Sequence, residues 1–187
     1  HATIRRQRQM CIRDSGVWAS RGRRVLHASA PGEAWNRVAD FPLRHRKDYV
    51  SVGRLASRLL RSEKCNVHPT REGKLLGLRR SVVYDLTSEA EDGGPRALGT
   101  VHGESVMPRA IAEDRHGRLY FGEYFGNPDR VPVRIWRADP DLERLEVAFE
   151  FPAGKTRHIH AVHADPFVAD RLWVTMGDFA GECHLVH

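Results

Sequence analysis

The sequence predicts an all-β protein, a fragment of a β-propeller built from four-stranded antiparallel blades. Three observations predict this class. A short motif (a turn residue, a basic residue, leucine and an apolar run) begins at Gly73, Gly117 and Asp170. Strand-like segments flank each copy, and few stretches hold the 3.6-residue period of an amphipathic helix. Four strands in about 40 to 50 residues are typical of one propeller blade.

The elements follow from the motif in order. A strand-like segment and a polar turn precede each copy, which predicts a β-hairpin whose second strand is the motif itself. Two further strands follow the first and second copies. The expected first strands are residues 65–68, 110–113 and 161–166, the second strands 73–78, 117–122 and 170–175, and the outer strands 81–86, 97–101, 132–137 and 145–151.

The N-terminal part of the chain repeats the same pattern. Residues 25–42 align without gaps on residues 135–152, so residues 17–42 are predicted to form the last two strands of a blade. The predicted domain therefore covers residues 17–187, as a partial propeller of about two complete and two partial blades. Their approximate ranges are 17–42, 54–101, 107–151 and 158–187.

Charge distribution argues against nucleic-acid binding. The chain has 187 residues and a formal net charge of +6. Residues 1–24 hold seven arginines and one aspartate, so they carry the whole surplus, and the remainder is neutral. A nucleic-acid-binding domain is expected to keep a basic face on its folded part. No apolar run reaches the roughly 18 residues of a transmembrane helix, so no membrane span is predicted.

The first 16 residues are predicted to be an arm outside the domain. The string from Gln9 to Ser15 resembles translated adapter DNA, and the alternative is a native disordered arm. The chain is expected to be an internal fragment of a longer protein. Its three cysteines are far apart and form no C-x-x-C pair, so neither a disulfide framework nor a cellular compartment follows from them.

A family resemblance lies in the turns between the expected outer strands. Residues 138–145 (ADPDLERL) and residues 32–35 (GEAW) resemble degenerate Asp boxes, the Ser-x-Asp-x-Gly-x-x-Trp turn of bacterial neuraminidase (BNR) repeats. Residues 111–182 also resemble bacterial propellers of the sialidase superfamily. The resemblance implies a propeller fold in which the box itself stabilises a hairpin and does not act in catalysis.

The resemblance leaves the activity open. Sialidases of this superfamily use three arginines, a Tyr–Glu nucleophile pair and an acid–base aspartate, and only Arg109 after Pro108 faintly matches their first arginine motif. The expected function is therefore a propeller module that binds a glycan or another small polar ligand. The alternative is an exo-sialidase-like glycoside hydrolase, or a lyase, whose remaining catalytic residues lie in missing blades.

Arg157, His158 and His160 form the most unusual local feature. In a regular strand His158 and His160 would face the same side with Cβ atoms roughly 7 Å apart. That arrangement can bind one divalent metal or one anionic ligand, at the entrance to an expected innermost strand. The alternative is a structural or water-solvated pair, since two histidines alone do not complete a metal site, and no other cofactor is indicated.

Four further residues are candidates for ligand binding. Glu123 and Tyr124 end the second strand of one expected blade, and Asp178 stands at the equivalent place in the next. Arg109 begins the strand that should pair with the one ending at Glu123. The hypothesis is that these side chains share one end of the propeller with the histidines. The alternative is polar strand ends without a ligand, with Glu123 paired to an arginine such as Arg134.

Overall fold

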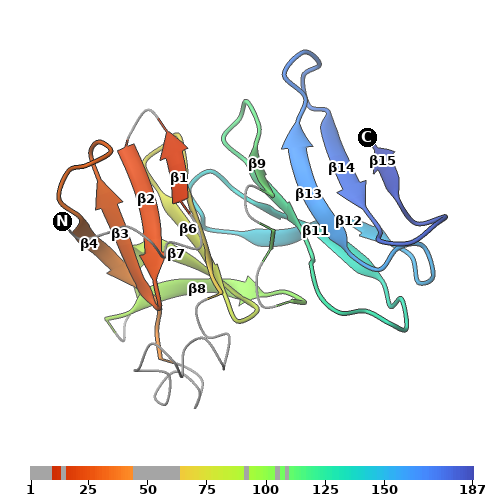
Figure 1. Cartoon of the computed structure of the whole chain (residues 1–187), viewed down its shortest axis with the longest axis horizontal. Helices are drawn as coiled ribbons and strands as arrows, with labels where there is room; N and C mark the ends of the chain where they lie inside the picture. Colours follow the sequence, from red (N-terminus) through yellow and green to blue (C-terminus); the bar gives the residue numbers. More distant parts are fainter. Residues whose placement is uncertain (1–9, 14–15, 44–63, 91–92, 104–105, 108–109) are drawn as a thin grey trace.

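The computed structural model describes residues 10–13, 16–43, 64–90, 93–103, 106–107 and 110–187. These residues form fifteen strands and no helix, so none of them belongs to a helix able to cross a membrane. The strands make four sheets that follow each other in chain order along the long axis of the molecule (Figure 1). This confirms the all-β prediction. Residues 1–9 of the predicted arm, the start of the second predicted blade (54–63) and Arg109 lie outside the described residues.

The first sheet has more strands than the sequence predicted. Two strands were expected within residues 17–42, but the described chain has three from Gly16 onward. A fourth, β1, falls in the segment assigned to the arm and pairs with β2. The extra hairpin was hidden because its turn is only Gly22–Arg23, with Gly22 at φ +63°. The strands are β1 (Met10–Arg13), β2 (Gly16–Arg21), β3 (Arg24–Ala28) and β4 (Asn36–Asp40).

The other three sheets follow the predicted repeat closely. Leu75, Leu119 and Leu172 of the recurring motif each begin the second strand of a sheet, and each second strand pairs antiparallel with the strand before it. The second sheet is β5 (Asn66–Pro69), β6 (Leu75–Arg79), β7 (Val82–Glu89) and β8 (Pro95–Thr100). The third is β9 (Ile111–Glu113), β10 (Leu119–Gly122), β11 (Val133–Ala138) and β12 (Leu145–Phe151). The fourth is β13 (Ile159–Ala164), β14 (Leu172–Met176) and β15 (His184–Val186).

A side-chain oxygen caps the first turn in each of these three sheets. Thr70 Oγ1 accepts a hydrogen bond from the Lys74 amide at 2.9 Å, and Asp114 Oδ1 accepts one from the Arg118 amide at the same distance. Asp165 Oδ1 accepts one from the Phe167 amide at 2.8 Å. Such Asx and Thr turns satisfy backbone donors that the hairpin ladder leaves free.

The two segments that resemble Asp boxes in sequence, residues 32–35 and 138–145, lie between the third and fourth strands of their sheets. In the hairpin between β11 and β12, the Leu142 amide donates to the Asp139 carbonyl at 3.0 Å. Leu142 has a φ of 56° and is fully buried, so an apolar side chain anchors this turn.

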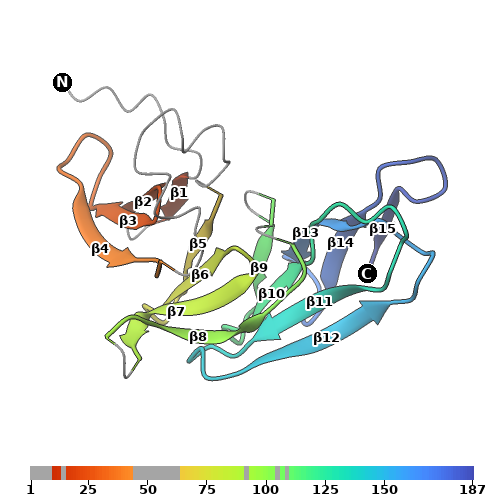
Figure 2. The ribbon, with the colours of Figure 1, turned by 90° about the horizontal axis from the view of Figure 1, so that it is seen from below.

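Apolar layers join consecutive sheets. Val25 and Phe41 share a buried cluster with Tyr84 of the second sheet. Leu76 shares one with Phe121 of the third sheet. A third layer unites residues of β10 and β11 with β13 and β14. In Figure 2 the outer strands β8 and β12 lie along one side of the molecule, away from β9 and β13.

The contact between the third and fourth sheets is close at one glycine. A β-carbon built on Gly122, the last residue of β10, would collide with Cβ and Cγ2 of Ile159, the first residue of β13. Ile159 is buried, and its amide donates a 2.9 Å hydrogen bond to the Glu123 carbonyl. Glycine at position 122 therefore lets the start of β13 lie against the end of β10.

Substitution of Gly122 by alanine tests this contact. We expect Gly122→Ala to lower the free energy of unfolding by about 1–3 kcal/mol, because the methyl group overpacks the junction. Gly126→Ala is the matched control, since a β-carbon at Gly126 meets nothing within 4 Å. Urea unfolding measures both, and equal stability of the two variants would contradict a tight junction.

Candidate functional site

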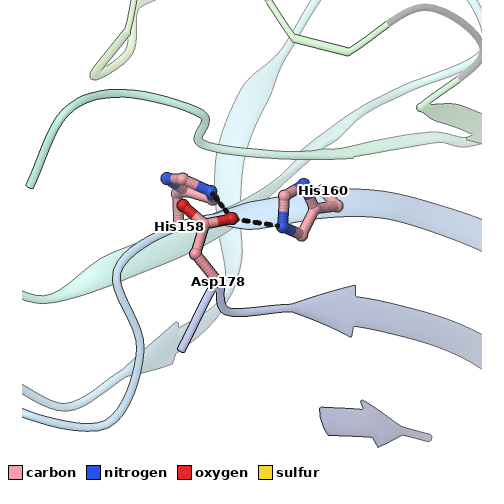
Figure 3. A group of neighbouring side chains, drawn as sticks. All are labelled: His158, His160 and Asp178. Atoms are coloured by element: carbon pink, nitrogen blue, oxygen red, sulfur yellow. Dashed lines mark ion pairs between the residues drawn. The ribbon is translucent and has the colours of Figure 1, made fainter. Parts of the chain in front are cut away.

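Strand ends of the third and fourth sheets form the candidate site. Tyr124 follows β10, His158 precedes β13, His160 lies within β13 and Asp178 follows β14. The structure brings these four residues together with Arg157. Figure 3 shows the Asp178 carboxylate between the two imidazole rings.

A β-bulge places the second histidine. Ile159 pairs with Met176 and Ala161 with Thr175, so His160 is the extra residue on its strand. A bulge bends the strand and redirects the side chains near it. The rings of His158 and His160 come to a centroid distance of 4.8 Å and stand at 87° to each other. The Tyr124 ring lies 4.5 Å from the His158 ring and 5.8 Å from the His160 ring, so it covers one side of the pair.

One carboxylate oxygen faces both imidazoles. Asp178 Oδ1 lies 3.2 Å from His158 Nε2 and 3.1 Å from His160 Nε2. His160 Nε2 is also 3.0 Å from the Gly177 carbonyl oxygen. Because both of these neighbours are acceptors, His160 in its neutral form carries its proton on Nε2 and donates it.

His158 has the opposite tautomer. Its Nδ1 lies 3.1 Å from the Phe125 carbonyl oxygen, which can only accept, so Nδ1 carries the proton. Nε2 of the neutral ring then presents a lone pair. That atom is buried, makes no hydrogen bond, and faces the Asp178 carboxylate without hydrogen-bond geometry. Two acceptors therefore oppose each other unless a proton or a metal cation stands between them.

Asp178 is surrounded by positive or potentially positive groups. Desolvation raises the pKa of its carboxyl, but the neighbouring imidazoles of His158 and His160 and the Arg157 guanidinium lower that pKa by a larger total amount. The net pKa lies below the ordinary aspartate value. Arg157 Nη1 is 3.6 Å from Asp178 Oδ2, so Asp178 is ionised at neutral pH.

Glu123 supports the site from behind. Its side chain is fully buried, and Oε1 accepts hydrogen bonds from the His102 amide at 2.9 Å and from Trp136 Nε1 at 3.0 Å. Oε2 accepts one from the Arg134 amide at 3.0 Å. The sequence suggested that Glu123 contacts a ligand or pairs with an arginine such as Arg134. In the structure it binds the Arg134 backbone, and the Arg134 side chain pairs with Glu150.

A pocket opens beside His158. Its volume is about 490 Å³, within the range of small-molecule sites. Tyr124, Arg157, His158 and Asp178 line one part of it. Another part is lined by Lys64, Ser81 and Gly103, which lie before, within and after the second sheet.

Sequence reasoning did not find several groups that shape this site. They are the carbonyls of Phe125 and Gly177, the Trp136 indole and Lys64. Backbone acceptors have no signature in a sequence. No protein-family model matches the chain, and no curated protein matches it significantly.

Removing the charge of Glu123 tests its supporting role. We expect Glu123→Gln to lower the free energy of unfolding by about 1–3 kcal/mol, because an amide NH₂ group would face one of three buried N–H donors. Glu150→Gln is the control, since its ion pair with Arg134 is exposed and worth little. Denaturant unfolding followed by tryptophan fluorescence gives both values. If Glu123→Gln lowers the free energy of unfolding no more than Glu150→Gln does, Glu123 does not stabilise the site.

Proposed function

We propose that the four sheets are blades of a β-propeller of the BNR repeat type, and that the chain is a module binding a small acidic carbohydrate. Three features support the propeller. Strands within each sheet follow in chain order, consecutive sheets share apolar layers, and β9 adjoins β13, where the Val162 amide lies 3.4 Å from the Ala110 carbonyl oxygen. Radial repetition of such sheets is the propeller architecture.

The pocket beside Arg157 and His158 is the observation that carries the binding proposal. Arg157 and Lys64 supply positive charge for a carboxylate, and Tyr124 supplies an aromatic ring for a sugar face. Asp178 supplies acceptors for hydroxyl groups. These are the donor, acceptor and stacking groups that a sugar acid requires.

Binding is favoured over glycoside hydrolysis by the state of Glu123. A hydrolase acid or base needs a carboxyl group that reaches the substrate. Both oxygens of Glu123 are occupied by buried N–H donors. Asp178 remains accessible, but its lowered pKa does not suit a general acid.

Arg157 provides the test. We expect N-acetylneuraminate to bind the full chain, and Arg157→Met to weaken binding at least tenfold, because a charge-assisted hydrogen bond to the ligand is worth about 1.5–3 kcal/mol. Arg144→Met is the matched control, since Arg144 is exposed and pairs with Glu146. Isothermal titration calorimetry measures the affinities.

The neutral methyl ester of the same sugar is the second control. It should bind the unaltered chain about as weakly as the acid binds Arg157→Met. Equal affinities of acid and ester would contradict recognition of a carboxylate. Turnover of a fluorogenic sialoside by the unaltered chain would favour the hydrolase instead.

A further inference from the structure

We propose that His158, His160 and Asp178 bind a divalent transition-metal ion, with Zn²⁺ the best fit. The metal site rests on these three side chains and does not depend on the proposed carbohydrate. Two imidazoles and one carboxylate form a nitrogen and oxygen ligand set that zinc binds in proteins. Three protein ligands also leave a fourth position, which here would face the pocket lined by His158 and Asp178.

The spacing of the ligand atoms fits a metal shell. One potential ligand atom from each residue lies within 4.8 Å of the others. Asp178 Oδ1 is 3.2 Å from one ring nitrogen and 3.1 Å from the other. Ligands about 2.0–2.1 Å from a tetrahedral zinc ion lie about 3.4 Å apart, so the two carboxylate–imidazole distances already fit. The two imidazole nitrogens, which lie within 4.8 Å of each other, would approach to the same separation by side-chain rotation.

The lone pair of His158 is the independent observation that points to a cation. The His158 side chain is only 6% exposed, and its Nε2 has no hydrogen-bond donor. A buried acceptor opposite a carboxylate is costly, and a metal ion between them would satisfy both. Protonation of His158 is the competing solution, and it would leave a simple ion pair without a metal.

A backbone carbonyl orients the His158 ring in the way that is usual for a histidine that binds a metal ion. A ligating histidine typically donates its other N–H to a carbonyl or carboxylate, which fixes the tautomer and the ring orientation. The Phe125 carbonyl provides this contact for His158. His160 would release the Gly177 carbonyl and move its proton from Nε2 to Nδ1 on binding. The bulge at His160 leaves its side chain 31% exposed, which gives room for this change.

The positive charge of Arg157 limits the affinity of the site for a divalent metal ion. Its charge lies 3.6 Å from Asp178 Oδ2 and opposes a dication. An anion at the open metal position would offset this charge, so phosphate or carboxylate should strengthen metal binding.

Titration of the metal-stripped full chain with ZnCl₂ tests the proposal. We expect one zinc ion per chain by calorimetry, with affinity reduced at least tenfold in His158→Ala and in Asp178→Asn. Asp178 is one-third exposed, so Asp178→Asn should keep the fold, which circular dichroism checks. Co²⁺ in place of Zn²⁺ should give visible d–d bands without a thiolate charge-transfer band.

Two controls separate this site from adventitious binding. Cys183→Ser removes an exposed thiol near the site, and His116→Ala removes an exposed histidine 3.2 Å from Asp170. Both should leave zinc affinity unchanged. Zinc binding that survives His158→Ala and Asp178→Asn but is lost in Cys183→Ser would overturn the proposal, as would no binding at all. No carbohydrate is present in this titration, so its failure leaves the carbohydrate proposal to its own test.

Discussion

The site depends on the close approach of β10 to β13. Gly122 has no side chain, so Ile159 lies against the backbone at the end of β10. The hydrogen bond from the Ile159 amide to the Glu123 carbonyl fixes that position. His158 and His160 flank Ile159 in sequence, and Tyr124 follows Glu123. One backbone junction therefore places both histidines beside the tyrosine ring.

Glu123 stabilises this junction, because both of its carboxylate oxygens accept hydrogen bonds from the protein. Its buried carboxylate binds the His102 amide, which follows β8, and the Arg134 amide and Trp136 indole, which both belong to β11. The side chains that can contact a ligand are those that line the pocket. Among these, the lone pair of His158 and the charge of Asp178 are arranged for a cation, and Arg157 is arranged for an anion. A bound metal and a bound acid would therefore support each other electrostatically.

The repeat predicted most of the strands, because turn residues and apolar runs recur at matching positions. The second strand predicted at each copy of the motif is present and begins at Leu75, Leu119 and Leu172. The pairing of His158 with His160 was suggested by their spacing, but the bulge at His160 was not. A register shift depends on how β13 meets β14, and a single sequence carries no signal for it. The partners of Glu123 were hidden for the same reason, since two are backbone amides distant along the chain.

The tautomer of His158 is the most direct test of this account. Long-range ¹H–¹⁵N correlation spectra of the metal-free chain at alkaline pH, where the rings are neutral, would report it, with His158→Gln used for assignment. The Phe125 carbonyl predicts a neutral ring with the proton on Nδ1 and an unprotonated Nε2. His160 should show the reverse, with its proton on Nε2. A proton on Nε2 of neutral His158 would mean that this nitrogen donates to Asp178, and the lone pair on which the metal site rests would not exist.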